Sequence, residues 1–156
     1  MGKNKEAIEL LKEAISKDTK NESLYFALGN TYDNLRASSE NKAGADDYFS
    51  LADIAYKKAI ELKTDYADAY FNLGVMHFNR GAEMANAANM LKSQTEYDKA
   101  KLKFEEVFNT AKPYLEKALE LNPKDYNTLT TLKQLYVRTG EKEKYNAVQK
   151  TLDSLK

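Results

Sequence analysis

Side chains able to do chemistry are few in this sequence, and their spacing does not indicate an active site. The chain contains no cysteine and one histidine, His77, so thiolate zinc sites and cysteine nucleophiles are excluded, and multi-histidine metal sites and Ser-His-Asp triads lack parts unless His77 serves alone. The carboxylates of Asp46 and Asp47 could form a dyad or a metal site, but they lie near the start of a predicted long helix, where acidic residues suit the helix dipole. No phosphate-holding glycine loop is present, so we expect no enzymatic activity, no cofactor and no catalytic or metal-binding residue.

The charge balance limits the classes of partner. Lys and Arg together number 24, as do Asp and Glu, so the net charge is zero. Nucleic-acid binders usually have a basic face, and proteins that bind anionic membranes have basic clusters, so both classes are disfavoured. No apolar run approaches the ~18 residues of a membrane span, and no signal peptide is recognisable. We expect a soluble protein, either cytoplasmic or, if an upstream targeting segment has been removed, periplasmic, whose partner is another protein or peptide.

The elements that must position these side chains are predicted to be helices. Ala, Leu, Glu and Lys dominate, whereas Gly and Pro number only six and two, a composition that favours helix. In the first segment, apolar residues follow one another with steps of one, three, three and one, at Ala7, Ile8, Leu11, Ala14 and Ile15. This spacing is typical of one helix face, and no convincing alternating strand pattern is present, so the expected fold class is all-α.

The sequence repeats itself with two different separations. Two sets of three segments are similar to one another: 24–32, 69–77 and 128–136 in the first set, and 12–21, 57–66 and 116–125 in the second. Leu28, Leu73 and Leu132 correspond in the first set and are separated by 45 and 59 positions. The same separations relate the corresponding alanines of the second set, Ala14, Ala59 and Ala118. Because two independent landmarks agree, the register of the repeat is secure.

The first set shares a spaced motif, aromatic-x-x-Leu-Gly-x-x-Tyr. One unit carries it in full, at Tyr25, Leu28, Gly29 and Tyr32. The next unit has Tyr70, Leu73 and Gly74, with His77 in the last position, and the third has Leu129, Leu132 and Tyr136, with Lys133 replacing the glycine. This motif resembles the first helix of the tetratricopeptide repeat (TPR) family. The resemblance places His77 at a core-tyrosine position, where we expect a buried, hydrogen-bonded side chain.

The second helix of the family's repeat carries a small residue, a large apolar residue and an alanine, with a proline after the helix. The resemblance extends to these positions, which are Ala52, Tyr56 and Ala59 in one unit and Ala111, Leu115, Ala118 and Pro123 in the next. In the last unit Tyr145 and Leu152 are bulkier than usual. Small residues let two helices approach closely, while large apolar ones fill the grooves. The resemblance implies a right-handed α-α superhelix, a solenoid of about seven antiparallel helices.

Two units exceed the family's period of about 34 residues, by about 11 and about 25. Both excesses fall between the two helices of a unit. The expected single domain, 1–156, then has four parts: 4–20, the second helix of a partial repeat; 21–65, a repeat with the shorter insertion; 66–124, a repeat with the longer one; and 125–156, a standard repeat.

The insertions themselves are predicted to be helical. The spacing predicts long helices over 43–63 and 68–92, and then a helix that begins at an N-cap, Ser93 or Thr95, and continues to about residue 121 with a kink at Pro113. The alternative for the longer insertion is an unstructured loop. A projecting helical hairpin is preferred, because long unstructured loops are uncommon in compact domains.

The resemblance also implies where a partner would bind. In the family, the first helices of successive units line a concave groove, and here the groove-facing positions are rich in aromatic and amide side chains: Phe26, Asn30, Asn34, Phe71, Asn72, Val75, Phe78, Asn79, Thr131, Gln134 and Arg138. Amides can bond a peptide backbone, and the rings supply apolar area. Alternatively, the phenylalanines pack against neighbouring helices. The cationic clamp with which some members bind C-terminal carboxylates is a poor match, because Phe26, Asn127 and Thr131 stand where cations are needed.

The leading hypothesis is a protein-interaction scaffold that binds a peptide or helix in this groove, of a kind widespread in bacteria. The alternative is structural self-association, including a homodimer, through the hairpins or the N-terminal helix. That helix, 4–17, matches only the second helix of a repeat, and we expect Ile8, Leu11 and Ile15 to be exposed. At the other end, helix 141–155 is expected to act as an end cap, with one apolar face made of Tyr145, Val148, Leu152 and Leu155.

Overall fold

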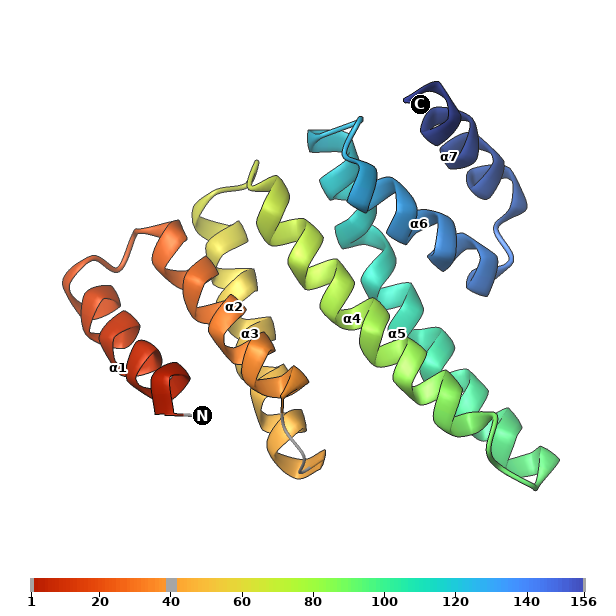
Figure 1. Cartoon of the computed structure of the whole chain (residues 1–156), viewed down its shortest axis with the longest axis horizontal. Helices are drawn as coiled ribbons and strands as arrows, with labels where there is room; N and C mark the ends of the chain where they lie inside the picture. The colour runs from red at the N-terminus through yellow and green to blue at the C-terminus, as the bar shows by residue number, and fades with distance from the viewer. Residues whose placement is uncertain (1, 39–41, 156) are drawn as a thin grey trace. The chain divides into compact units, whose positions relative to one another are not determined.

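The computed structural model describes residues 2–38 and 42–155, which form helices joined by short turns (Figure 1). The helices of these ranges are α1 (Gly2–Lys17), α2 (Glu22–Ala37), α3 (Lys42–Leu62), α4 (Ala67–Ala88), α5 (Gln94–Leu121), α6 (Tyr126–Thr139) and α7 (Lys142–Ser154). Within the described ranges there is no strand, so the all-α prediction is confirmed. None of the described helices is both long and apolar enough to cross a lipid bilayer.

Both insertions are helical, as predicted. The shorter one lengthens α3, and the longer one forms the hairpin of α4 and α5 (Figure 1). Of the two predicted N-caps, Ser93 caps α5, its hydroxyl oxygen accepting a hydrogen bond from the Glu96 backbone N–H at 3.4 Å. α4 ends at Ala88, a turn earlier than predicted. α5 is continuous through Pro113, and the kink expected there stays a prediction.

The chain divides into two compact units, Met1–Leu73 and Gly74–Lys156, with the boundary inside α4. In unit 1, α2 packs against α3 around a close approach at Gly29, where an added Cβ would lie 2.6 Å from Cδ1 of Tyr56. A glycine is needed here because the Tyr56 ring, 1% exposed, fills the space that a side chain would take. The surrounding core residues are Leu28, Tyr32, Leu35, Ala52, Ala55 and Ala59.

The prediction that the apolar face of α1 is exposed is wrong, because another helix covers this face. Ile8 is 6% exposed, and Leu11 and Ile15 are half-buried, because α1 packs against α2. The second helix of a repeat packs against the first helix of the next repeat as well as against its own partner. α2 therefore covers this face of α1. The exposed large apolar residue of α1 is instead Leu10, at 61%.

In unit 2, α4 and α5 pack through two glycines of α4. An added Cβ would lie 2.6 Å from Cγ of Leu115 at Gly74, and 2.8 Å from Cδ1 of Phe108 at Gly81. His77 is 8% exposed, as expected for a core position, and its ring stacks on that of Tyr114 with centroids 6.1 Å apart.

The last repeat of unit 2 is held by defined helix ends and a polar network. Asp125 caps α6, its carboxylate accepting from the Thr128 N–H at 2.6 Å, and Gly140, at φ 74°, makes the left-handed turn into α7. Val148 and Leu152 are buried as predicted, whereas Leu155 is 39% exposed because α7 ends at Ser154.

The polar network joins α5, α6 and α7 around two glutamates. The Glu141 carboxylate is bonded by Lys112 at 3.1 Å, by Lys144 at 3.2 Å and by the Thr139 hydroxyl at 2.8 Å. The Glu116 carboxylate accepts from Lys144 at 2.7 Å and from the Tyr136 hydroxyl at 2.9 Å. The end of unit 2 is thus fixed by polar contacts as well as by its core.

Candidate protein-binding surface

Two of the predicted groove residues of unit 1, Asn30 and Asn72, are bonded to each other. The Asn30 side-chain oxygen accepts from the Asn72 amide at 2.8 Å and from the Tyr56 hydroxyl at 2.7 Å. Burial raises the pKa of Tyr56, so its hydroxyl stays protonated and continues to donate. This amide bridge joins α2 to the start of α4, and it occupies both lone pairs of the Asn30 oxygen.

The aromatic groove residues of unit 1 differ in their environment. Phe26 is half-buried, and its ring lies 4.9 Å from that of Tyr66 and 6.0 Å from that of Tyr56. Phe71 is half-buried, and Asn34 is exposed. Phe26 therefore packs against α3 and the turn that follows it, which agrees with the alternative to a ligand-binding role, while Asn34 and part of Phe71 remain open to solvent.

In unit 2 the predicted groove residues Phe78 and Arg138 contact each other. Phe78 is 6% exposed, and its ring lies 5.7 Å from that of Phe108. The Arg138 guanidinium carbon lies 5.9 Å from the Phe78 centroid and 5.6 Å from the Phe108 centroid, a cation–π arrangement. These contacts join α6 to the α4–α5 hairpin. Phe78 was expected to line the groove, but its burial leaves it no surface to offer a partner.

The other predicted groove residues of unit 2 are at least partly open. Val75 and Thr131 are half-buried, and the Thr131 hydroxyl donates to the Asn127 carbonyl at 2.9 Å. Asn79 and Gln134 are exposed. Asn79, Gln134 and the exposed edge of Arg138 therefore present amide and guanidinium groups to solvent.

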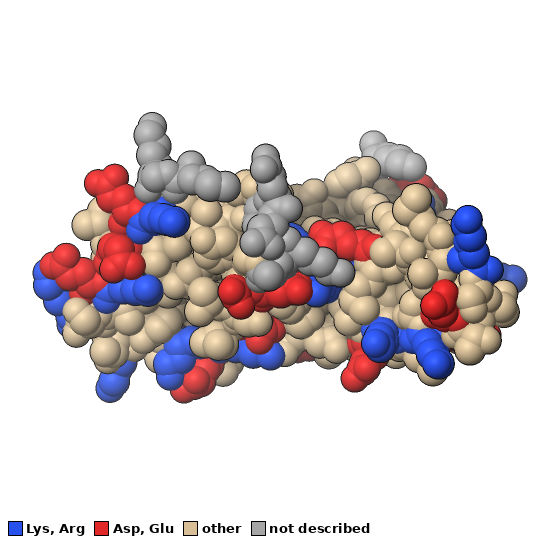
Figure 2. Space-filling model, turned by 90° about the horizontal axis from the view of Figure 1, so that it is seen from below, with Lys and Arg blue, Asp and Glu red and all other residues tan. Residues whose placement is uncertain are grey.

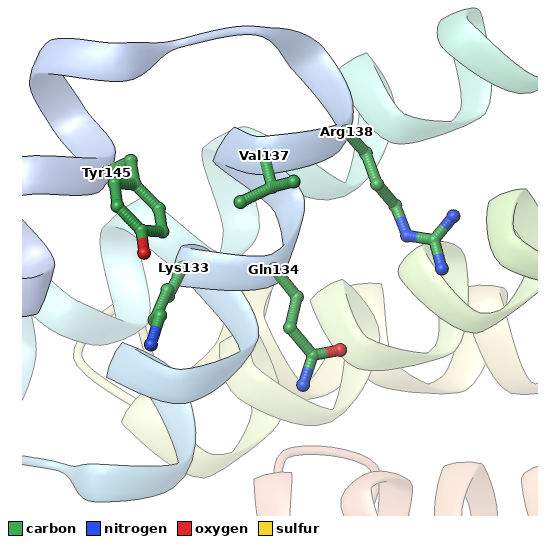
Figure 3. A pocket seen from close by; sticks show the side chains of 5 residues that line it. All are labelled: Lys133, Gln134, Val137, Arg138 and Tyr145. Atoms are coloured by element: carbon green, nitrogen blue, oxygen red, sulfur yellow. The ribbon is translucent and has the colours of Figure 1, made fainter.

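A pocket that sequence reasoning missed lies between α6 and α7. It has a volume of about 390 Å³ and is lined by Lys133, Gln134, Val137, Arg138 and Tyr145. Four of these side chains come from α6, and Tyr145 reaches in from α7 (Figure 3). Of the five, only Gln134 and Arg138 were predicted site residues. The signal that could have revealed the others was Lys133 at the glycine position of the repeat.

The charge on α6 differs from the zero net charge of the chain as a whole. Figure 2 shows cationic and anionic side chains interspersed on the face that it presents. α6, however, contains Lys133 and Arg138 and no acidic residue. Neither side chain has an ion-pair partner in the ranges that the structure describes. The exposed side of α6 is therefore locally cationic.

The chain is similar in fold to solved helical-repeat structures. The crystal structure of MamA matches with a TM-score of 0.64 and 23% sequence identity, over 97% of this chain and 67% of that one. A structure of a monomeric IFIT1 mutant with m7Gppp-AAAA covers 99% of this chain and 44% of that one, at 16% identity and a TM-score of 0.45. At these identities the first likeness shows the fold alone, and the second is too distant to carry an argument. No curated protein matches the chain.

Two family models match segments of the sequence. The model described as TPR repeat matches residues 1–35 and 55–81, and the model described as tetratricopeptide repeat matches residues 102–125. Together the matched segments make up just over half of the chain, and they contain Gly29, Gly74 and Gly81, the glycines at which helices of the two units approach closely. The predicted family is thus confirmed by its sequence models and by the fold: this chain belongs to the tetratricopeptide repeat family.

Proposed function

We propose that the chain is a protein-interaction scaffold that binds a polypeptide segment on the exposed faces of α4 and α6, the first helices of the repeats in unit 2. Members of the family generally mediate protein–protein interactions and are generally not enzymes. The observation that carries the proposal for this chain is in unit 2. There, Asn79, Gln134 and Arg138 remain exposed on helices joined through the Phe78–Arg138 contact.

The chemistry of this surface suits an extended or helical peptide. Side-chain amides donate and accept at once, so Asn79 and Gln134 can bond backbone N–H and C=O groups without regard to sequence. Val75 and Thr131, half-buried on the same two helices, supply apolar area beside them. Because the Phe78–Arg138 contact orders this surface before a partner arrives, little conformational entropy is lost on binding.

The experiment is a selection of displayed random peptides on the full chain, followed by affinity measurement on variants. Asn79→Ala and Gln134→Ala should each weaken the selected peptides by about 3- to 10-fold, the loss expected for one or two peptide hydrogen bonds. The matched control is Asn109→Ala, which removes an exposed amide from α5 of the same unit. Failure to select any peptide, or equal affinities for all three variants, would contradict the proposal.

The self-association alternative has less support. It was expected to use the hairpins or an exposed Ile8, Leu11 and Ile15 stripe on the N-terminal helix, and α2 covers that stripe. Size-exclusion chromatography with light scattering over a range of protein concentrations tests what remains of it. A dimer whose dissociation is unaffected by Leu10→Ser would show that α1 is not the interface.

A further inference from the structure

Two positions that hold small residues in the earlier repeats hold large ones in the last repeat. Lys133 stands where α2 and α4 have glycines, and Tyr145 corresponds to Ala52 and Ala111, which are 0% exposed. Lys133 and Tyr145 are both half-buried and lie together, with the lysine nitrogen 5.7 Å from the ring centroid.

Both enlarged residues line the pocket between α6 and α7 (Figure 3). In the earlier repeats the small residues lie at closely packed crossings, such as that of Gly74 with Leu115. At the corresponding positions of the last repeat, the two bulky side chains line an open space of about 390 Å³. Pockets that bind ligands or ligand side chains have volumes of about 300–1,000 Å³, so this one can hold an apolar side chain with its neighbouring atoms.

The walls of the pocket are apolar, and its rim is cationic. Val137 is 64% exposed, and it lines the pocket together with Tyr145 (Figure 3). Lys133 and Arg138 lie on either side, on a helix without acidic residues. In the same unit, by contrast, the Lys144 ammonium is neutralised by Glu116 at 2.7 Å. The positive charge at this pocket is therefore available to a ligand of opposite charge.

We propose that the pocket binds an apolar side chain of an acidic peptide, whose flanking carboxylates lie against Lys133 and Arg138. This inference rests on the proposed function, which makes the ligand a peptide, and adds which side chains the peptide carries and where on the chain it binds. The apolar side chain covers Val137 and the Tyr145 ring, and the Gln134 amide at the edge bonds the peptide backbone. Two cations beside an apolar wall suit such a peptide better than nucleic acid, which needs a longer row of cations along its phosphates.

The test uses the full chain and peptides selected from a random displayed library, labelled for fluorescence anisotropy. The selected peptides should contain an apolar residue flanked by Asp or Glu. Lys133→Met, which keeps the length of the side chain, should weaken them by about fivefold, as for a partly exposed ion pair. Lys150→Met, which removes an exposed cation of α7 outside the pocket, should change affinity by less than about twofold. Lys133→Glu should reverse the preference, so that peptides with lysine in place of the acids bind better.

Two further readouts separate the outcomes. Tyr145→Ala should weaken peptides with a large apolar residue more than matched peptides with glycine there, while circular dichroism reports whether the variant is folded. Selected peptides without acids, equal affinities in Lys133→Met and Lys150→Met, or stronger binding of an oligonucleotide of equal charge would overturn the pocket assignment. If peptides bind and respond to Asn79→Ala but not to Lys133→Met, the scaffold function stands and the pocket assignment fails. If no peptide is selected, both fail.

Discussion

Gly74 lies where α4 crosses α5 in unit 2, and Gly74→Ala tests whether close helix packing holds this unit together. An added Cβ would lie 2.6 Å from Cγ of Leu115, 2.9 Å from its Cδ2 and 3.1 Å from its backbone nitrogen. Leu115 is 0% exposed. Because one of the contacted atoms belongs to the backbone, a rotamer change alone cannot relieve the clash, and α5 must move.

Two opposing terms set the size of the effect. Alanine is favoured over glycine in a helix interior by about 1 kcal/mol, whereas overpacking a core costs about 1–3 kcal/mol. The backbone contact places this site near the upper end of that range, so Gly74→Ala should lower the free energy of unfolding by about 1–2 kcal/mol. In a chain of this length the loss corresponds to a decrease in Tm of about 2–8 °C.

The assay is urea and thermal unfolding followed by far-ultraviolet circular dichroism, in a double-mutant cycle with Leu115→Ala. That variant alone should cost about 2–5 kcal/mol for the cavity it creates. It also removes the side-chain atoms that an alanine at Gly74 would meet. The double variant should therefore be more stable than the sum of the single effects predicts, by at least about 0.5 kcal/mol. A Gly74→Ala protein as stable as the wild type, or strictly additive effects, would refute the reasoning.

Three further predictions concern polar contacts. Asn30→Ala removes the acceptor of a buried tyrosine hydroxyl and should cost about 1–3 kcal/mol in urea unfolding, while the exposed Asn34→Ala should stay within about 0.5 kcal/mol. Asp125→Ala removes the N-cap of α6 and should cost about 1 kcal/mol; no change in the urea midpoint would show that the cap is dispensable. Although burial raises the pKa of Glu141, hydrogen bonds from a threonine and two lysines outweigh it and hold that pKa below its ordinary 4.5. The stabilisation by this carboxylate is therefore present above pH 4.5 and is lost as the pH falls through the lowered pKa. In urea unfolding at neutral and at acidic pH, Glu141→Gln should lower the midpoint at neutral pH and reduce the decrease in midpoint between the two pH values. The control Glu143→Gln should leave both midpoints unchanged.

Much of the helical architecture could be predicted, because it is encoded locally. The apolar period within each segment, together with Ser93 as a cap, predicts the α4–α5 hairpin without any knowledge of distant contacts. The exposure of Ile8 could not be predicted in the same way. It depends on which helix lies against α1, and a pattern within α1 describes the apolar face but not what covers it.

The sequence predicted which helices carry the candidate site residues, but not which of their side chains face solvent. The repeat register places Asn30, Asn72, Phe78 and Arg138 on the first helices. Whether each side chain faces solvent depends on the reach of its neighbours, such as the hydroxyl of Tyr56, which ends 2.7 Å from the Asn30 oxygen. Such contacts join residues far apart in the chain, and no spacing rule within one helix contains them.

The glycine position of the first helix affects the neighbouring polar side chains differently in the first full repeat and in the last repeat. In unit 1 the Tyr56 ring lies against Gly29, and this position brings its hydroxyl to Asn30 and so supports the amide bridge to Asn72. A side chain at Gly29 would displace the ring and break the bridge, so core packing and surface polarity are coupled there. In the last repeat Lys133 replaces the glycine; Arg138 of α6 contacts the buried Phe78 and Phe108 rings, while Gln134 is exposed. The Gln134 amide is therefore open to solvent, unlike the Asn30 amide oxygen, which accepts from Tyr56 and Asn72. This is why the binding chemistry particular to this chain should be sought on α6, where the repeat departs from its pattern, rather than on α2, where it follows it.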